Sequence, residues 1–307
     1  MSIIVTGGAG FIGSHLVDFL IKNTTENMII YDNFSRGLHR NIEQHKYNSK
    51  ISIIDGDIND EDLLKDVIKK NDIVFHLAAE ASVLGSIKNE DLTFSTNVIG
   101  TYKILETSKN AKVNKIIFTS SREVYGEGAG LQVGENFPLN PKNAYGLSKV
   151  IDEMYCDFFR KEHNMDIRVL RLANVYGERD LNRVIPIWIN NAFNGRPLKV
   201  FGGDQIIDFI HVSQVVRALW ATSIKDEFVS PINIGSGIGT SIISLAEKIC
   251  RMSKIDLNRI EFLPSNSQEV RCFIADVTKM NNELNIRSEI DPLFALSEMM
   301  LKQYNPK

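Results

Sequence analysis

Short apolar runs alternate with helical hydrophobic patterns along the first half of the chain. Runs of this length between helices are typical of parallel strands that are covered on both faces. Right-handed crossovers between such strands predict an α/β fold with a doubly wound parallel sheet. Strands are predicted at 2–6, 28–31, 51–55, 72–76, 115–120 and 166–172, and helices at 11–22, 60–70, 92–109 and 144–163.

The regular alternation of strand and helix patterns ends after Asn174, and turn clusters follow at 194–197 and 201–204. Helical patterns follow at 213–223 and 240–251, and a last helix is predicted at 291–303 with Pro292 near its start. We therefore predict a parallel-sheet domain at 1–174, to which 205–235 returns, and a smaller C-terminal lobe. The lobe comprises 175–204 and 236–307, and the crevice between the two units would hold a substrate.

Composition, net charge and cysteine spacing exclude several classes of function. The 307 residues are 43% hydrophobic with a net charge of −3, which gives no broad electrostatic case for nucleic acid or an anionic membrane. The three widely spaced cysteines form neither a disulfide framework nor a metal knuckle, and no residue cluster has metal-ligand spacing, so no metal is predicted. Without a signal-peptide pattern or a membrane-length apolar run, a cytoplasmic protein is expected.

A glycine-rich turn joins the first predicted strand to the first helix. Its glycines, Gly7, Gly10 and Gly13, allow a tight turn and close approach of the backbone to a pyrophosphate. Asp32 ends the second strand, where a carboxylate accepts hydrogen bonds from the adenosine ribose and repels a 2′-phosphate. NAD is therefore predicted over NADP, although the nearby Arg36 leaves NADP open. Asp57 either faces the adenine or is a turn residue.

Tyr145 and Lys149 lie four residues apart, on one face of a predicted helix. A free tyrosine titrates near ~10 and is a poor base at neutral pH. A nearby lysine and a positive nicotinamide would lower the tyrosine pKa, so that Tyr145 could take a proton from a sugar hydroxyl. Ser121, at the end of the fifth strand, would hydrogen-bond the same hydroxyl.

These motifs together resemble the extended short-chain dehydrogenases. TGGAGFIGSH, YDN, HLAA, SSxxVYG, YGxSK and NVYG are similar to the NAD-dependent nucleotide-sugar epimerase/dehydratase family, with UDP-glucose 4-epimerases a close pattern. The resemblance implies a Rossmann fold, tightly bound NAD that is regenerated in each cycle, and a UDP-sugar substrate. It also implies a homodimer built through a four-helix bundle from the helices at 92–109 and 144–163.

The resemblance also assigns residues. It implies Ser121, Tyr145 and Lys149 as the catalytic set, with Glu123 as a further candidate. It implies Asn97 at a position that supports the active-site helix, and a nucleotide and sugar site with Asn174 near the substrate diphosphate. Implied NAD contacts are Gly7, Gly10, Phe11, Ile12, Gly13, Asp32, Asn33, Ser35, Asp57, Ile58, Leu77, Ala78, Ala79, Asn97, Tyr145 and Lys149. Implied substrate contacts are Val83, Ser121, Arg122, Glu123, Asn174, Arg183, Val184 and Phe201.

The sequence Ser121-Arg122-Glu123 departs from the family patterns. Related 4,6-dehydratases carry Thr-Asp-Glu there, in which the aspartic acid protonates the leaving hydroxyl. Arginine stays charged and cannot replace that acid. Glu123 is then an ion-paired neighbour of Arg122, a contact to substrate hydroxyls, or the base of an elimination or decarboxylation. Arg122 could alternatively bind a sugar carboxylate.

Two arginines that hold the diphosphate in many relatives are absent. Ile207 occupies the position before Asp208, and 265–269 reads SNSQE where an Arg-Pro-Gly motif is common. Arg179, Arg183 or Arg271 could compensate. The sequence favours a UDP-hexose 4-epimerase that works through a 4-keto sugar. A dehydratase or decarboxylase that uses Glu123 is the second reading, and a catalytically silent NAD-binding protein is the third.

Overall fold

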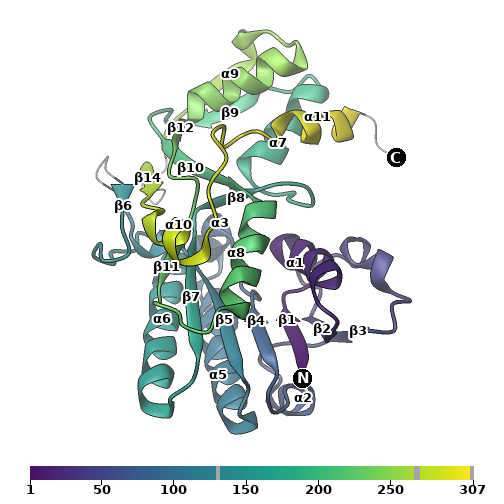
Figure 1. Ribbon diagram of the computed structural model, residues 1–307. Coiled ribbons are helices and arrows are strands. Elements are labelled where there is room, and N and C mark those ends of the chain that lie inside the picture. The colour runs from purple at the N-terminus through teal and green to yellow at the C-terminus, as the bar shows by residue number, and fades with distance from the viewer. Residues whose placement is uncertain (129–131, 266–269, 305–307) are drawn as a thin grey trace.

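A parallel sheet of seven strands forms the centre of the molecule (Figure 1). The computed structural model describes residues 1–128, 132–265 and 270–304. The strand order, β11-β7-β5-β4-β1-β2-β3, reverses beside β1, and every neighbouring pair is parallel. The predicted doubly wound α/β fold is thereby confirmed. The strands are β1 (Ser2–Thr6), β2 (Asn27–Asp32), β3 (Ile51–Asp55), β4 (Ile73–His76), β5 (Lys115–Ser121), β7 (Ile167–Leu172) and β11 (Ile232–Ile234).

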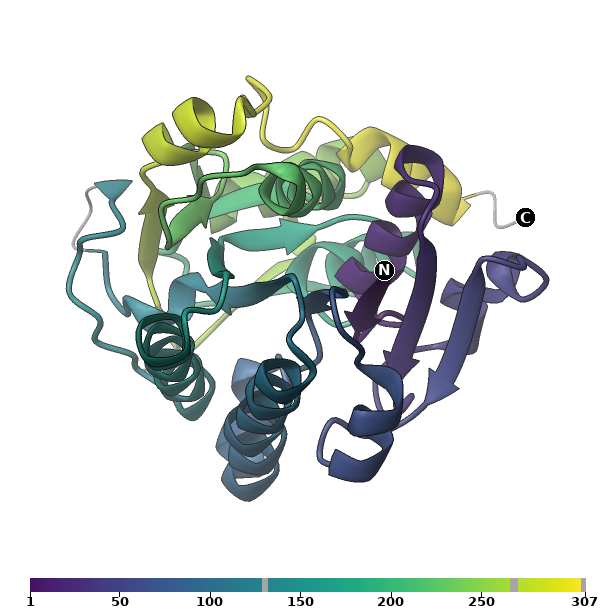
Figure 2. The ribbon, with the colours of Figure 1, turned by 60° about the horizontal axis from the view of Figure 1, so that its bottom comes forward.

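Helices cover both faces of this sheet (Figure 2). Helices α1 (Phe11–Asn23) and α8 (Val212–Ile224) pack together on one face, and α2 (Glu61–Val67), α5 (Gly100–Ala111) and α6 (Ala144–His163) cover the other. Successive residues of β1 alternate between the two cores: Ile3 and Val5 pack with α1, whereas Ile4 packs on the α5 side. Strands that are buried on both faces explain why the sequence shows continuous apolar runs there.

Two predicted helices differ in detail from the structure. The stretch expected at 92–109 consists of α4 (Glu90–Thr93), a π-helical segment η3 (Phe94–Ile99) and α5. The last helix, α11 (Leu296–Tyr304), begins five residues later than predicted, and Pro292 lies in the turn before it. Asp291 explains the delay, because its carboxylate accepts from the Leu293 amide at 2.8 Å. That local bond competes with the helical hydrogen bonds.

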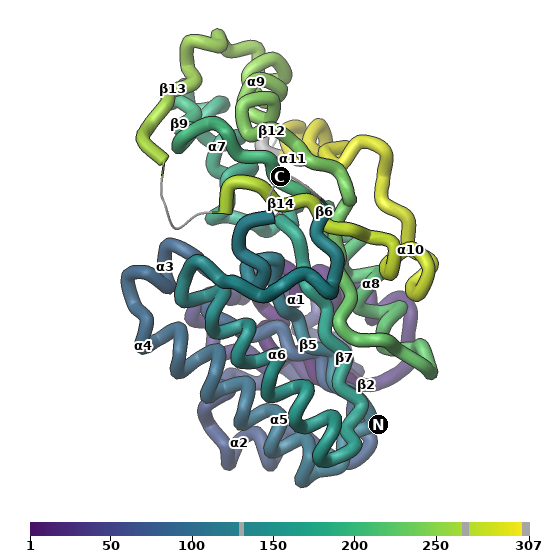
Figure 3. The backbone as a smooth tube through the Cα atoms, turned by 90° about the vertical axis from the view of Figure 1, so that its left-hand side faces the viewer, coloured from purple at the N-terminus to yellow at the C-terminus, as the bar shows by residue number. Residues whose placement is uncertain are grey.

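A smaller unit packs above the carboxyl ends of the sheet strands, as Figure 3 shows from the side. Its strands form one five-stranded and one two-stranded sheet, around a core that includes Trp188, Leu198 and Leu245. Most of these strands have two to four residues, too short for a periodic signal. The elements are β6 (Gln132–Val133), β8 (Asn174–Tyr176), β9 (Leu198–Phe201), β10 (Ile206–His211), β12 (Gly239–Ser241), β13 (Ile260–Leu263), β14 (Cys272–Ala275), α7 (Val184–Phe193), α9 (Ile242–Ser253) and α10 (Thr278–Leu284).

The segment 205–235 contributes to both units. Its first strand, β10, pairs with β8, β12 and β14 in the five-stranded sheet. Its helix α8 then packs beside α1, and β11 forms the edge of the seven-stranded sheet. No helix among the described residues is long and apolar enough to cross a membrane.

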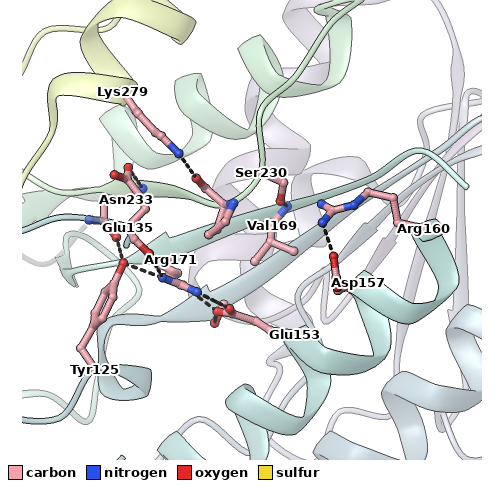
Figure 4. A network of polar contacts seen from close by, with 12 residues as sticks. Tyr125, Glu135, Glu153, Asp157, Arg160, Val169, Arg171, Ser230, Asn233 and Lys279 are labelled. Atoms are coloured by element: carbon pink, nitrogen blue, oxygen red, sulfur yellow. Dashed lines mark hydrogen bonds and ion pairs between the residues drawn. The ribbon is translucent and has the colours of Figure 1, made fainter. Parts of the chain in front are cut away.

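A buried polar network ties α6 to the sheet (Figure 4). Arg171 on β7 forms an ion pair with Glu153 of α6 at 2.6 Å, and it donates to the Tyr125 hydroxyl at 2.8 Å. That hydroxyl donates in turn to Asn233 of β11 at 2.6 Å. Ser120, at the end of β5, also donates to Glu153. The network therefore fixes the position of α6 relative to three neighbouring strands.

Candidate active site

A cavity of about 870 Å³ opens where the sheet strands end and the smaller unit begins. Open parallel sheets bind ligands at this edge, where the strand order reverses. Every residue predicted to contact cofactor or substrate lines this cavity, apart from Asn97. Residues at or directly after the ends of the central strands contribute to its wall, namely Gly7, Asp32, Gly56, Leu77, Ser121 and Leu172.

The glycine turn has the tight geometry that the sequence predicts. Gly7 has a φ of +70°, and a Cβ there would lie 2.8 Å from the Ala78 amide nitrogen. A Cβ on Gly13 would lie 2.1 Å from the Gly7 carbonyl oxygen. A Cβ on Gly10 would meet only that carbonyl, at 3.1 Å, so this side of the turn is open. The turn thus exposes the start of α1, where helix amides are free to bind phosphate.

Asp32 lies at the end of β2 in the same wall. Its carboxylate accepts hydrogen bonds from the amides of Ala9 and Phe34, both at 2.9 Å. Burial raises the pKa of this carboxyl, while the two backbone amides oppose the rise. A carboxylate offers about four acceptor positions, so two backbone bonds leave room for ribose hydroxyls. Asp57 lies nearby and accepts from the Asn33 side chain at 2.9 Å.

Arg36, which the sequence placed near the cofactor, and Glu80, which it did not assign to the site, form an ion pair in this part of the cavity wall. Arg36, in the loop after β2, forms an ion pair with Glu80, in the loop after β4, and both line the wall. The pairing occupies Arg36, the residue that left NADP open. A sequence cannot reveal such a pair, because the two residues are 44 positions apart.

Asn97 does not line the cavity as an NAD contact would, but it lies where the resemblance implies a residue that supports the active-site helix. It is fully buried in the π-helical segment and does not line the cavity. Its side-chain oxygen accepts from the Glu80 amide at 2.8 Å, and its nitrogen donates to Ser148 Oγ at 2.8 Å. Asn97 thus joins the loop after β4 to the first turns of α6.

The three predicted catalytic residues line one region of the cavity. Ser121 ends β5, whereas Tyr145 and Lys149 lie on the first turns of α6, which Asn143 caps by accepting from the Gly146 amide at 2.8 Å. Lys149 is only 2% exposed. Its ammonium lies 3.5 Å from Asp152 Oδ2 and 4.5 Å above the centre of the Phe118 ring.

Arg122 and Glu123 follow Ser121 in a short 3-10 turn and also line the cavity. Arg122 Nη2 lies 2.8 Å from Glu123 Oε1. Asn143 donates to the other carboxylate oxygen, Oε2, at 2.9 Å. Glu123 is 5% exposed, so these two neighbours compensate most of its lost hydration.

Apart from Val83, which begins α3 (Val83–Lys88) after β4, the remaining substrate candidates lie on the smaller unit's side of the cavity. Asn174 Oδ1 is buried and has no hydrogen-bond partner among the described residues, which leaves this acceptor available to a ligand. Arg183 pairs with Asp180 at 3.4 Å and lies over the Phe11 ring. Ile207, at the position of one missing arginine, lines the wall. The other missing motif falls largely on 266–269, outside the described residues. Val83, Val184 and Phe201 line the cavity as well.

Of the three arginines named as substitutes, Arg179 and Arg183 line the cavity and Arg271 does not. Arg271 instead lies 3.5 Å from Asp204, and Arg179 forms an ion pair with Asp18 at 2.6 Å. Sequence reasoning missed Lys199, which lines the cavity from β9. Within the described part of the chain, Lys199 is the cation in this wall for which no acidic partner lies within ion-pair distance.

Comparison with known proteins agrees with this geometry. The sequence profile of the NAD dependent epimerase/dehydratase family matches residues 3–235. The chain belongs to this family. A putative UDP-glucose 4-epimerase of Methanocaldococcus jannaschii is 38% identical over 297 residues, which cover 94% of each chain. It follows that the protein is an NAD-dependent enzyme of the nucleotide-sugar epimerase/dehydratase family.

Solved structures of family members superpose along the whole chain. The UDP-glucose 4-epimerase of Thermotoga maritima, crystallised with UDP-glucose, is 32% identical, with a TM-score of 0.91 and 99% of each chain covered. A dTDP-glucose 4,6-dehydratase of Streptomyces venezuelae, crystallised with NAD, is 25% identical, with a TM-score of 0.95 over 99% of this chain and 98% of that one. The open side of the Gly10 turn and the Asp32 carboxylate at the end of β2 fit the NAD that this family uses.

Proposed function

We propose that the protein is a nucleotide-sugar 4-epimerase that acts on a UDP-hexose. The observation that carries the proposal is the state of Glu123. One of its oxygens is paired with Arg122 and the other accepts from Asn143. A carboxylate held in this way is a poor base, and Arg122 occupies the position from which a general acid would act in elimination.

The rest of the site supports reversible oxidation at the sugar C4. Bound NAD supplies a hydride acceptor and donor. Ser121 would orient the C4 hydroxyl, and Tyr145 would take its proton and later return it to the same oxygen. Lys149 would stabilise the tyrosinate by its positive charge. Inversion follows when the 4-keto sugar turns its other face to the cofactor.

Lys199 is our candidate for holding the substrate diphosphate. It lies in the cavity wall, and no acidic partner neutralises it within the described residues. A phosphate would therefore gain a charge-assisted hydrogen bond without breaking an existing ion pair. Arg183, whose pairing with Asp180 is longer at 3.4 Å, is the second candidate.

A homodimer is the assembly that we infer for this enzyme. Helices α5 and α6 expose large apolar side chains on their outer faces, although globular monomers rarely expose large contiguous apolar patches. A second copy would cover them in a four-helix arrangement. The exposed residues on these helices and the preceding α4–η3 segment are Leu92, Phe94, Ile99, Tyr102, Leu147, Met154, Tyr155 and Phe158.

Proton NMR in D₂O tests the proposed reaction. The protein is incubated, without added NAD, with UDP-glucose, UDP-N-acetylglucosamine or UDP-glucuronate. A 4-epimerase gives the C4 epimer with no deuterium in the ring, because the same hydride returns. Deuterium at C5, or loss of water or of the carboxylate, would instead make Glu123 a working base and support the dehydratase or decarboxylase reading.

Two tyrosine variants complete this experiment. Tyr145→Phe is expected to lower turnover by about 10²- to 10⁴-fold, which is the usual contribution of a general base. Tyr155→Phe, on the outer part of the same helix, is the matched control and should retain activity. Unchanged cellular activity of Tyr145→Phe would support a catalytically silent NAD-binding protein.

A further inference from the structure

A stripe of functional groups runs along the inner face of α6, from the cavity into the core. Tyr145, Lys149, Asp152 and Cys156 follow one another at helical spacing. Tyr145 is half-buried at the cavity, whereas Asp152 has no exposed surface. The mechanism proposed above uses the first two residues and gives no role to Asp152.

Asp152 is an unusual buried carboxylate. Within residues 1–128, 132–265 and 270–304, neither of its oxygens has a partner in good hydrogen-bond geometry, although the Lys149 ammonium and the Thr101 hydroxyl are close enough to favour its charged form. Its compensating contact is the Lys149 ammonium, 3.5 Å away. A fully buried carboxylate that is only poorly hydrogen-bonded lowers the stability of the fold that contains it. The contact partner of this group is the proposed catalytic lysine.

The other charged or titratable groups around Asp152 leave Lys149 as the cation that it faces. Glu153, the next residue on α6, turns its carboxylate to Arg171 and Ser120. On β4, burial and then the Lys149 charge lower the pKa of His76 to about 3, which keeps its ring neutral. Burial raises the pKa of the Cys156 thiol well above its ordinary value, so it is neutral too. From α5, the Thr101 hydroxyl approaches Asp152 but carries no charge.

We propose that Asp152 is a positioning residue that holds the Lys149 ammonium and moderates its effect on Tyr145, so that Tyr145 can both take and return the sugar proton. This inference rests on the proposed function, because it makes Tyr145 the group that exchanges the proton. An epimerase must run the proton transfer in both directions at the same oxygen. A base whose pKa is close to the working pH serves both directions best.

The net charge of the Lys149–Asp152 pair determines how strongly the pair stabilises a Tyr145 anion. When Asp152 is ionised, the Lys149–Asp152 pair has no net charge and stabilises a tyrosinate weakly. When Asp152 is neutral, the pair has a net positive charge and stabilises the tyrosinate strongly. Burial raises the pKa of Asp152 to about 7, against the opposing effect of Lys149, so both states are accessible near neutral pH. The protonation state of Asp152 therefore sets the net charge of the pair that Lys149 presents on the same helix face as Tyr145.

The test is a pH titration of the tyrosinate absorption in the NAD-loaded protein. Tyr145 is isolated as the difference between the wild type and Tyr145→Phe. Asp152→Asn removes the negative charge at similar volume, and it should move the Tyr145 midpoint to lower pH by about one unit. Asp152→Glu keeps the charge and should leave the midpoint close to that of the wild type. An unchanged or raised midpoint in Asp152→Asn would overturn the proposal.

Two further variants distinguish the effect of the Asp152 charge from a structural effect of its replacement. Asp157→Asn, on the exposed side of the same helix, removes an acid paired with Arg160 and Lys161, and it should not move the midpoint. An equal shift in Asp157→Asn would also refute a specific role for Asp152. If Asp152→Asn does not fold, Asp152→Ser gives the same neutral site, and the same downward shift is expected.

The titration requires no turnover, so it separates this inference from the proposed function. Absence of C4 inversion in the wild type would reject the epimerase and leave the effect of Asp152 on Tyr145 measurable. In an active enzyme, the acidic limb of the kcat/KM profile should move with the spectroscopic midpoint. A merely structural role would lower the rate and leave that limb in place.

Discussion

The Arg122 guanidinium lies 2.8 Å from the Glu123 carboxylate, and both side chains line the cavity beside Ser121. Two neighbours in the sequence thus neutralise each other at the position where related dehydratases place an acid and a base. The pair changes the chemistry that the site favours, because it removes a free base and offers no general acid. In the proposed mechanism, Ser121, Tyr145 and Lys149 are then the groups that serve hydride transfer at C4.

Glu123→Gln is expected to retain C4 inversion. The substitution keeps the shape and the bond to Asn143 but removes the charge, so activity should fall less than tenfold if Glu123 has no proton to move. A working base would instead lose about 10²-fold or more. Initial rates of epimer formation by NMR measure the difference. Arg122→Gln/Glu123→Gln is the control, since it leaves no unpaired buried charge.

Lys199→Gln is expected to weaken substrate binding without slowing the chemistry. Loss of one charge-assisted hydrogen bond to the diphosphate should raise KM for the UDP-sugar about tenfold, with kcat little changed. Arg271→Gln is the matched control, because Arg271 pairs with Asp204 and does not line the cavity. Equal effects of both substitutions on KM would contradict the assignment of Lys199.

Removing one residue of the Arg171–Glu153 ion pair should lower the free energy of unfolding more than removing both residues. Arg171→Met leaves Glu153 buried and unpaired, which should cost about 3–5 kcal/mol of unfolding free energy. Arg171→Met/Glu153→Met removes both charges and should recover part of that loss. Urea unfolding of the two single variants and the double variant measures the coupling. Additive losses would show that the pair is not coupled.

Asp152 should make the protein less stable as pH rises. Its folded pKa of about 7 lies above its ordinary value of 3.8, so the folded state holds the proton over that interval while the unfolded state has lost it. Stability therefore falls between those two pH values. The free energy of unfolding of Asp152→Asn relative to the wild type should increase across this window. A difference that is constant with pH would contradict the raised pKa.

Phe158→Glu should dissociate the proposed dimer. Phe158 is 52% exposed on the outer face of α6, and a buried glutamate in a dimer interface would have no partner. Sedimentation velocity should show the wild type as a dimer and the variant as a monomer. Ile290→Glu is the control, because Ile290 is exposed outside these helices. A wild-type monomer at micromolar concentration would reject the interface.

Elements with local signals could be predicted from the sequence alone. β1, the glycine turn and α1 follow from an apolar run, a turn composition and helical periodicity within 23 residues. Asp32 was identified because it ends the next strand, and Tyr145 and Lys149 because a spacing of four places two side chains on one helix face. Their common location follows from the fold rule that parallel strands present their carboxyl ends at one edge.

Which charges form ion pairs and which do not became evident only from the three-dimensional packing. Arg36 meets Glu80, and Lys199 reaches the cavity from β9 without an acidic partner among the described residues. The burial of Asp152 is another such result, because α6 alone does not reveal that α5 and the sheet cover it. Pairing and burial depend on contacts between distant segments, whereas periodicity depends on neighbours along the chain. Whether the Glu123 carboxylate is free to act also depends on a contact between distant segments. Asn143, 20 positions away, donates to one of its oxygens, while the neighbouring Arg122 pairs with the other.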